Sequence, residues 1–533
     1  MLKKILALLL ALTMMFSVVT LLAACEEDSG KKKSSSSKKD DDEDEDEDED
    51  DEDNEDEDGE DEDKDGDEED EDKDDEDEET EPDEDEETEP TEAPTEPVAD
   101  CYDGSKVTIT FAHTMGYSLQ SVLDAYIEKF NEQYPNITVQ QESYGSWYDI
   151  ENRISTEILT GEQPNIAYCY PDHLAAYNNA GALVALNKFI ADNAKIIRAD
   201  GKTETFGLTR QQINNFIPAF YNEGLALGDG NMYSLPLNKS TEVMYYNKTF
   251  FEANGLDVPT TWEEMEAVCR AIKEIDPTCI PLGYDSEENL FITLCEQFGY
   301  DYTSATGDHV LFNNDDCKKM VEVLHGWYND GLLTTQNLYG AYTSGLFSGN
   351  DGICCYMSIG SSGGATYNLP DDGAFEVGVA AIPQADPRNP KTICQGPSLC
   401  MLKDSDTSDQ ELYASWLFMK FLTTDVDFQV DFSMTTGYMP VIQSAVDHTA
   451  YQIWLGAANG YEQITARVAG CALENADSYF TSPVFVGSST VRWQVGILFL
   501  NCMGVIIEPG KILIDEIDYL FDEAYQVCLD TIG

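Results

Sequence analysis

The sequence predicts an α/β fold divided into two lobes. Three observations lead to this prediction. Short β-branched runs alternate with helical segments, the alternation resumes beyond residue 260, and residues 101–533 are enough for two or three conventional domains. Strand–helix–strand order favours a parallel sheet covered by helices, and two such lobes suit the length better than one very large sheet.

The first predicted lobe begins with a strand at 107–111, where the sequence Val-Thr-Ile-Thr-Phe is rich in β-branched residues. Residues 119–134 carry apolar side chains at helical spacing and predict a helix that ends before Pro135. The next predicted elements are a strand at 137–139, a helix at 150–159 and a strand at 165–170.

The second predicted lobe contains a helix from Trp262 to Ile275. Thr260 and Thr261 precede it as capping residues, and Glu263 and Glu264 in its first turn suit the positive end of the helix dipole. Further helices are predicted at 411–422 and 512–529.

The N-terminus has the pattern of an export signal. Two lysines are followed by an apolar run from Ile5 to Leu22 and then by Leu-Ala-Ala-Cys, which ends at Cys25. The run could nearly span a bilayer, but the small residues before Cys25 resemble the lipobox of bacterial lipoproteins. We therefore expect a signal peptide at 1–24 and a lipidated Cys25 that carries acyl chains such as palmitate.

Residues 25–100 are predicted to be a disordered acidic linker. Residues 26–100 hold 48 acidic and 7 basic side chains, out of a net charge of −74 for the whole chain. Residues 101–533 still carry −35, which argues against nucleic acid and anionic lipid as partners. A near match to a calcium loop at 61–72 lacks flanking helices, and we interpret this segment as a solvated tether.

No catalytic or metal-binding motif is evident. The five histidines lack metal-ligand spacing, no Cys-x-x-Cys pair occurs, and phosphate-loop and Gly-x-Ser-x-Gly motifs are absent. The sequence therefore predicts no metal, no cofactor and no enzyme activity. The 13 cysteines after Cys25 are an odd number, and their disulfide pairing cannot be derived from the sequence.

Three segments, in the same order, resemble the extracellular solute-binding proteins of ABC importers. They are Tyr233–Lys248 with its Tyr-Tyr-Asn-Lys block, Phe347–Gly352 continuing to Ser361–Gly363, and Trp416–Leu422 together with the Gly-Tyr-Met-Pro loop in Thr436–Val441. The nearest branch is the glycerol-3-phosphate-binding one. The resemblance implies a two-lobed periplasmic-binding-protein type II fold, with a mixed sheet covered by helices in each lobe and a hinge between the lobes.

The resemblance also implies the lobe boundaries. Residues 101–236 with 396–438 would form the N-terminal lobe, and residues 237–395 with 439–533 the C-terminal lobe. The chain would cross between the lobes near 236–240, 383–396 and 437–441.

The family's binding residues carry over to several positions of this sequence. Arg492, with Ser240, Gly396 and Ser361, matches the set that would hold a phosphate, although Arg492 could instead form a structural ion pair. Tyr438 matches an aromatic residue of the pocket, and either Tyr148 or Trp147 matches another. The family's acidic residue has no clean match, because Pro171 occupies its place, and Asp172 stands one position later. These implied ligand-binding residues are Trp147, Tyr148, Asp172, Ser240, Ser361, Gly396, Tyr438 and Arg492.

The function that the resemblance implies is solute capture for an ABC permease at the outer face of the membrane of a Gram-positive-type bacterium. The ligand would be a carbohydrate or sugar-like polyol, with glycerol-3-phosphate or its diesters as a sub-case, and the protein would be a monomer. Two alternatives stay open at this point: a surface glycoside hydrolase, which needs two carboxylates in one cleft, and a carbohydrate-adhesion protein.

Overall fold

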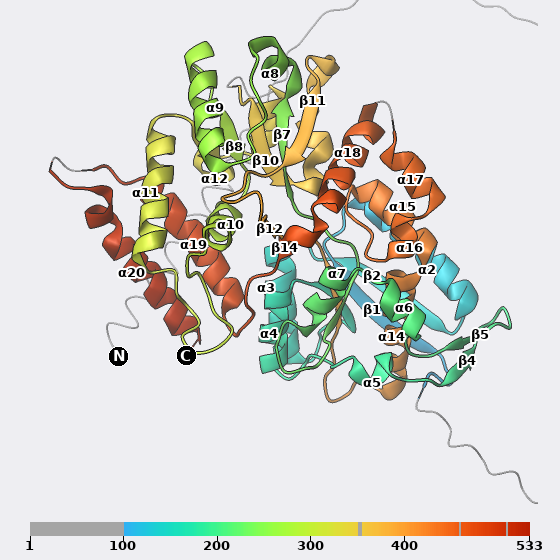
Figure 1. Cartoon of the computed structure of the whole chain (residues 1–533). Coiled ribbons are helices and arrows are strands. Elements are labelled where there is room, and N and C mark those ends of the chain that lie inside the picture. Colours follow the sequence, from blue (N-terminus) through green and yellow to red (C-terminus); the bar gives the residue numbers. More distant parts are fainter. Residues whose placement is uncertain (1–100, 350–353, 458–459, 508–509, 533) are drawn as a thin grey trace, which may run out of the picture. The chain divides into compact units, whose positions relative to one another are not determined.

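Two five-stranded sheets organise the described part of the chain (Figure 1). The structure is a computed structural model and describes residues 101–349, 354–457, 460–507 and 510–532, all within one compact unit of the chain. The predicted signal peptide, Cys25 and the acidic linker lie outside the described residues. Both sheets are mixed and carry helices, which confirms the predicted α/β class.

The first sheet has the strand order β2-β1-β3-β13-β6. Its strands are β1 (Val107–His113), β2 (Ile137–Ser143), β3 (Ile166–Cys169), β6 (Ser234–Pro236) and β13 (Ser398–Met401). β1 pairs in parallel with β2 and β3, as the strand–helix–strand pattern predicted, whereas β13 runs antiparallel to both β3 and β6. The first sheet therefore takes one strand from a segment more than 150 residues further along the chain.

The second sheet has the order β11-β7-β10-β8-β9. Its strands are β7 (Glu242–Asn247), β8 (Leu282–Tyr284), β9 (Leu333–Thr335), β10 (Met357–Ser361) and β11 (Val377–Ala381). β7 lies between β10 and β11 and is antiparallel to both. Two short ribbons complete the strands: β4 (Lys195–Ile197) with β5 (Thr203–Thr205), and β12 (Thr392–Ile393) with β14 (Tyr479–Phe480).

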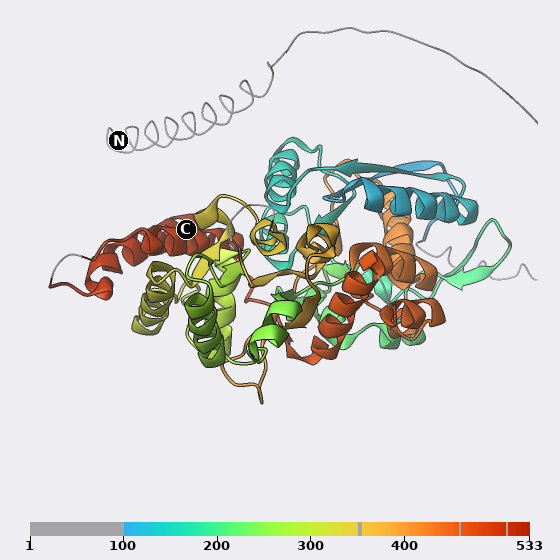
Figure 2. The same cartoon turned by 90° about the horizontal axis from the view of Figure 1, so that it is seen from above.

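Helices pack on each sheet, and Figure 2 shows the two groups from a second direction. Those that contribute to the first core are α2 (Tyr117–Gln133), α3 (Trp147–Thr160), α4 (Pro171–Asn179), α5 (Asn187–Ile190), α6 (Arg210–Asn215), α7 (Pro218–Asn222), α14 (Asp409–Thr424), α15 (Val426–Thr436), α16 (Gln443–Val446) and α17 (Thr449–Leu455). Those that contribute to the other cores are α8 (Lys248–Asn254), α9 (Trp262–Ile275), α10 (Glu287–Phe298), α11 (Asp315–Asn329), α12 (Gln336–Tyr339), α13 (Thr343–Ser348), α19 (Ser488–Met503) and α20 (Leu513–Ile532).

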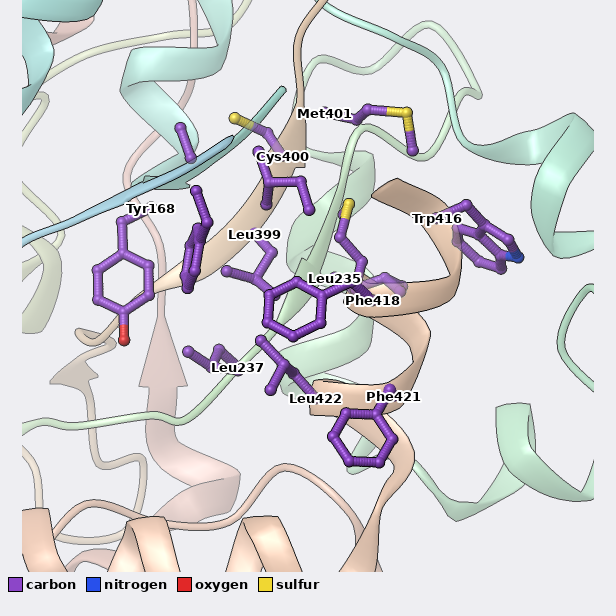
Figure 3. Packing of buried hydrophobic residues seen from close by; sticks show 14 of the residues in the cluster. Tyr168, Leu235, Leu237, Leu399, Cys400, Met401, Trp416, Phe418, Phe421 and Leu422 are labelled. Atoms are coloured by element: carbon purple, nitrogen blue, oxygen red, sulfur yellow. The ribbon is translucent and has the colours of Figure 1, made fainter. Parts of the chain in front are cut away.

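The first core forms where α14 packs on the first sheet (Figure 3). Trp416, Phe418 and Leu422 of α14 are almost fully buried against strand residues such as Leu235 and Leu399. The Trp416 indole N–H donates to the carbonyl oxygen of Phe206 at 2.8 Å, so this buried polar atom is paired.

The helix predicted at Trp262–Ile275 is α9, and it begins and ends at the predicted residues. Thr261 and Glu264 form a reciprocal capping box at its start. Met265, Cys269 and Ile272 follow at helical spacing and are fully buried in the second core.

α18 (Gly460–Glu474) connects two cores. Ala466, Ala469 and Ala472 belong to the first core, whereas Ile464 and Val468 belong to a small third core beside β7 and β11. α18 therefore packs against elements of both lobes.

The predicted crossing segments meet at Lys239, between β6 and β7. Lys239 is fully buried, and its ammonium group forms an ion pair with Glu223 and donates to the carbonyl oxygen of Gly396 at 3.2 Å and to the Ser398 hydroxyl at 3.0 Å. Its backbone forms two hydrogen bonds with Met439, at 2.7 and 3.0 Å. Burial would lower the pKa of Lys239, but the adjacent Glu223 outweighs this effect and the pKa is raised.

The lobe boundaries proposed from the sequence remain a prediction, and one detail of packing bears on them. Val441, Ile442, Ala445 and Trp454 belong to the first core, not to the second. The reason is that α16 and α17 pack beside α15, and the chain contributes to the second core again from Phe480 of β14 onward.

Three further observations concern the described residues alone. No described helix has the length and apolar character needed to cross a membrane. No disulfide joins cysteines in this part of the chain, although the sulfur atoms of Cys295 and Cys317 lie 3.7 Å apart. No cluster of histidine, cysteine and carboxylate side chains there has the geometry of a metal site.

We predict that Lys239→Ala lowers the free energy of unfolding by about 3–5 kcal/mol, because the substitution leaves Glu223 buried without a counter-charge. Urea denaturation measures this loss. The double variant Lys239→Met/Glu223→Gln should recover much of the stability, since it removes both charges. Arg388→Ala, which breaks an exposed ion pair with Asp386, is the control and should leave stability nearly unchanged. A Lys239→Ala protein as stable as the parent would contradict the assignment.

Candidate functional site: a cleft of two chambers

Two adjoining cavities lie where the two lobes face each other, and both are lined by Trp147 and Tyr438. The first, here called the acidic chamber, has a volume of about 290 Å³. The second, here called the hydroxyl chamber, has a volume of about 350 Å³. Both lie near the lower end of the range for small-molecule sites.

Residues near the N-termini of four helices line the acidic chamber. Trp147 is the first residue of α3, Asp172 the second of α4, Glu288 the second of α10 and Ser489 the second of α19. Local sequence sets two of these starts, because Ser146 caps α3 and Ser286 caps α10 through side-chain hydrogen bonds. Helix N-termini carry partial positive charge, which favours the carboxylates in the first turns.

Carboxylates dominate the acidic chamber. It is lined by Glu151, Asp172, Glu242, Asp285 and Glu288, and among the described residues that line it Arg492 is the only arginine and there is no lysine. These carboxylates differ in how they are paired: Asp285 accepts from the amide and the hydroxyl of Thr343 at 2.8 and 2.7 Å, whereas the buried Oδ1 atom of Asp172 has no partner.

Arg492 is already engaged with the protein. It lies on α19, half-buried, and its guanidinium donates to the side-chain oxygen of Asn289. Burial would lower the pKa of Arg492, but the nearby carboxylates of Glu288 and Asp172 outweigh burial and raise it. Arg492 is therefore a permanent cation whose charge is offset by its acidic neighbours.

A buried hydrogen-bond chain connects Arg492 to the start of β7. Asn289, which accepts from Arg492, donates to Glu242 at 2.8 Å, and the Tyr284 hydroxyl also donates to Glu242. Burial raises the pKa of Glu242 to about 7, even though both hydrogen bonds favour its charged form. Glu242 is the first residue of β7, directly after the segment that links β6 of the first sheet to β7 of the second sheet. The carboxyl group with the raised pKa therefore lies next to this linking segment.

The hydroxyl chamber carries no lysine, arginine, histidine or carboxylate among its lining residues. Its polar lining residues other than tyrosines are Thr114, Ser118, Asn238, Thr366, Thr435, Thr436 and Thr465. Gly363 packs so closely against Tyr438 that an added Cβ atom would lie 2.7 Å from the ring. A side chain at position 363 would therefore displace the aromatic ring that both chambers share.

Two contacts join the lobes directly at the cleft. The Ser489 hydroxyl on α19 donates to Glu151 on α3 at 2.5 Å. Beside it, the rings of Tyr148 and Trp493 meet edge to face, with centroids 5.8 Å apart. Figure 1 shows α3 and α4 next to α19, consistent with the contacts between α4 and α19.

The structure brings five of the predicted ligand-binding residues together. Trp147, Asp172, Ser361, Tyr438 and Arg492 all line the acidic chamber. Of the two alternatives for the early aromatic residue, Trp147 lines the cavity, whereas Tyr148 is 57 % exposed and contacts Trp493.

Ser240 and Gly396 are not among the described residues that line either of these two chambers. Ser240 is fully buried, and its hydroxyl lies 2.8 Å from that of Ser362 and 3.3 Å from that of Ser361. Gly396 has φ +90°, and a Cβ atom there would lie 2.6 Å from the carbonyl oxygen of Asn238. Both residues act in the packing of the crossing segments, and their predicted ligand role stays a prediction. Cys25 lies outside the described residues.

Sequence reasoning missed several residues of the cleft, among them Asn238, Glu288, Asn289 and Tyr170. For two of these residues, their position in the chain could have indicated a place in the cleft. Asn238 precedes the buried Lys239 in a crossing segment, and Glu288 stands in the first turn of a capped helix.

Comparison with known proteins identifies the family. The family model described as bacterial extracellular solute-binding protein matches residues 125–458, more than half of the chain. The chain belongs to the bacterial extracellular solute-binding proteins. As members of this family are the non-catalytic binding components of ABC importers, the prediction that this solute-binding protein is not an enzyme is confirmed, and its location is extracytoplasmic.

Among its relatives is the sn-glycerol-3-phosphate-binding periplasmic protein UgpB of Escherichia coli K12. It is 25 % identical over 367 residues, which are 65 % of this chain and 76 % of that protein. The protein of the same name from Shigella flexneri matches to the same extent.

Solved structures confirm the two-lobed fold. The solute-binding protein resembles UgpB of Mycobacterium tuberculosis in complex with glycerophosphocholine (TM-score 0.62, 17 % identity, covering 79 % of this chain and 98 % of that one). It also resembles the cyclic alpha-maltosyl-1,6-maltose binding protein of Arthrobacter globiformis (TM-score 0.59, 19 % identity, covering 80 % and 99 %).

We predict that Glu242→Gln makes the stability of the solute-binding protein less dependent on pH between 5 and 8. A carboxyl whose pKa is raised by folding binds its proton more tightly in the native state, so its contribution to stability falls as pH rises from about 4.5 through about 7. The unfolding free energy of the variant minus that of the parent should therefore increase with pH in this window. A difference that is constant from pH 5 to pH 8 would contradict the prediction.

Proposed function

We propose that the protein is a lipid-anchored, monomeric receptor that captures a sugar-like polyol in the two-chamber cleft and delivers it to an ABC permease. The observation that carries this proposal is the composition of the cleft, where aromatic rings alternate with carboxylates and hydroxyl groups. Sugars offer an apolar ring face to aromatic side chains and hydroxyl groups to carboxylates.

Aromatic rings form a continuous wall along both chambers. Trp147 stacks on Tyr168, with centroids 6.0 Å apart and an interplanar angle of 16°, and its centroid lies 4.1 Å from that of Tyr170. Tyr168 lines the hydroxyl chamber, Tyr170 lines the acidic chamber and Trp147 lines both. A ligand can therefore contact aromatic surface throughout the cleft.

The charges of the acidic chamber favour a neutral solute over a phosphoester. A phosphate beside Arg492 would also lie near the carboxylates of Glu288 and Asp172, which already offset that cation. Like charges in a partly buried site raise the free energy of binding. Two residues of the expected phosphate set, Ser240 and Gly396, are absent from the lining of the chamber.

A phosphoester remains the second candidate, because one observation favours it specifically. Arg492 and Ser361 line the same chamber, and a guanidinium with a hydroxyl donor can bind phosphate. The glycerol-3-phosphate-binding relatives are similar over 65 % of this chain.

Capture would use closure of the two lobes about the crossing segments around Lys239. The hydrogen bond from Ser489 to Glu151, two residues that line the acidic chamber, would then stabilise the closed arrangement of the lobes. Outside the cell, the acidic linker at 25–100 would hold the binding domain away from the membrane of a Gram-positive-type bacterium, within reach of the permease.

We predict that a neutral sugar raises the melting temperature of the full-length protein. A ligand at 100 times its dissociation constant adds about 2.7 kcal/mol to the free energy of unfolding. The panel should contain mono- and oligosaccharides together with glycerol-3-phosphate and glycerophosphocholine. Trp147→Ala should abolish the shift, and Tyr519→Ala, which removes an exposed aromatic residue from α20, is the matched control.

The outcomes of this panel separate the two candidates. A phosphoester shift that disappears in Arg492→Ala, with sugars inactive, would favour the second candidate. If neither class shifts the melting temperature, the proposed function fails.

We predict that Cys25→Ala releases the protein from the membrane fraction, because the lipid attachment site is lost. Labelling cells with a palmitate analogue and fractionating them would show a labelled membrane protein for the parent and an unlabelled, membrane-free protein for the variant. Cys101→Ala is the control. Membrane retention of an unlabelled parent would exclude the lipid anchor.

A further inference from the structure

Two cysteines of the second core lie side by side. Cys295 on α10 and Cys317 on α11 are both fully buried, and their Sγ atoms are 3.7 Å apart. The sulfur atoms of a disulfide are about 2.05 Å apart, so these two need to approach each other by less than about 2 Å to form a bond. Rotation of both side chains about their Cα–Cβ bonds can bring the sulfur atoms together without moving the helices.

The ends of the two helices hold both cysteines in place. α10 ends one turn after Cys295, where Gly299 has φ +72° and the amide of Tyr300 donates to the Cys295 carbonyl oxygen at 2.9 Å. Asn314 caps the start of α11, and its side-chain oxygen accepts from the amide of Cys317 at 2.9 Å. The positions of the two cysteines are therefore set by backbone that is already hydrogen-bonded.

The segment that connects the two helices is folded back on itself. The Asp301 carbonyl oxygen accepts from the side-chain amide of Asn314 at 2.8 Å and lies 3.7 Å from the sulfur of Cys317. A β-bridge within the segment joins its outgoing and returning halves. The chain thus brings the end of α10 back to the start of α11, so a bond between the cysteines requires no change of topology.

The surroundings of the pair indicate when such a bond can form. Burial and the adjacent Cys317 raise the pKa of the Cys295 thiol well above its ordinary value, which disfavours the reactive thiolate in the folded protein. Oxidation is therefore favoured during folding, before α10 and α11 exclude water. The extracytoplasmic location of the protein exposes its folding chain to an environment that permits disulfides.

We propose that Cys295 and Cys317 are oxidised to a disulfide bond after export, while the second core assembles. The oxidant is a disulfide compound outside the cytoplasm, such as oxidised glutathione or the active-site disulfide of an oxidoreductase. One cysteine thiolate attacks a sulfur atom of the oxidant and displaces the first thiol; the other then attacks the mixed disulfide and displaces the second. The pair loses two protons and two electrons, and the oxidant gains them as two thiol groups.

The bond would stabilise the lobe that contains the second core. It would join residues 22 positions apart, and closing such a loop lowers the conformational entropy of the unfolded chain. α10 also carries Glu288 and Asn289 near its start, where both line the acidic chamber. Tying α10 to α11 would therefore secure one wall of the cleft, whichever solute the cleft binds.

The experiment is a disulfide map of the full-length protein recovered from bacterial cells that export it in air. Thiols are blocked with N-ethylmaleimide before lysis, and the unreduced protein is cut with a protease that cleaves after glutamate. The cut after Glu296 separates the two cysteines into the peptides 289–296 and 297–322, each with one cysteine. Mass spectrometry should find these two peptides linked, and treatment with dithiothreitol should separate them.

Melting temperatures test whether the bond stabilises the fold. The protein as isolated should melt at least about 3 °C higher than protein unfolded and refolded in dithiothreitol. This difference should shrink by about 3 °C in Cys295→Ala and in Cys317→Ala. It should be unchanged in Cys502→Ala, the matched control, which removes a fully buried thiol from α19. Each variant is compared with its own reduced form, so the packing lost with the sulfur atom cancels.

Three results would overturn the inference, and none of them affects the proposed function. One is that both peptides are recovered unlinked and blocked by N-ethylmaleimide. Another is that either cysteine is linked to a different cysteine. The third is a melting-temperature difference that stays the same in both alanine variants. If these variants do not fold, the peptide map of the parent protein decides the question.

Discussion

The ion pair between Lys239 and Glu223 is the interaction on which the arrangement of the cleft depends. Lys239 is fully buried, and it holds three separate segments through the Glu223 carboxylate, the Gly396 carbonyl group and the backbone of Met439. A buried ammonium group needs all of its hydrogen bonds, so these segments are fixed relative to one another. Asn238, on one side of Lys239, and Tyr438, beside Met439, owe their positions in the cleft to this arrangement.

Helix starts explain how an acid-rich protein can concentrate carboxylates in one cavity. Residues near the starts of α3, α4, α10 and α19 line the acidic chamber, and a helix N-terminus carries partial positive charge. Asp172 and Glu288 stand in the first turns of α4 and α10, close to this partial positive charge. Arg492 is the one lysine or arginine among the described residues that line the chamber, and the helix N-termini add partial positive charge around the carboxylates.

Local sequence predicted the elements well because their signals are local. Thr261 and Glu264 determine the start of α9, and the β-branched residues from Val107 determine β1. The strand predicted at 107–111 extends to His113, since pairing with β2 continues over the whole length. The third crossing near Gly437 was harder to place, because whether α16 joins one core or the other depends on packing against α15, which no local pattern encodes.

The candidate site was predictable only in part, for the same reason. Trp147, Tyr438 and Arg492 line the acidic chamber at positions that the family resemblance gives, whereas Asp172 lines it one position after the place where the family has its acidic residue. Asn238 was missed although it lies within the matched segment, because its place in the lining of the hydroxyl chamber depends on packing against residues such as Thr436, which lies 198 positions away. The ligand role of Ser240 stays a prediction, and its hydroxyl contacts those of Ser361 and Ser362, which lie in a segment distant in sequence.

The bridging position of α18 has a mechanical consequence. Its alanine face lies in the first core and its Ile464 and Val468 face lies in the third, so a rotation of one lobe must slide this helix over at least one of these surfaces. Small alanine side chains interdigitate less than large ones, so α18 shifts more easily along the first core than along the third. The rate at which the two lobes open and close would then depend on how α18 repacks against these cores, and not only on rotation at the crossing segments.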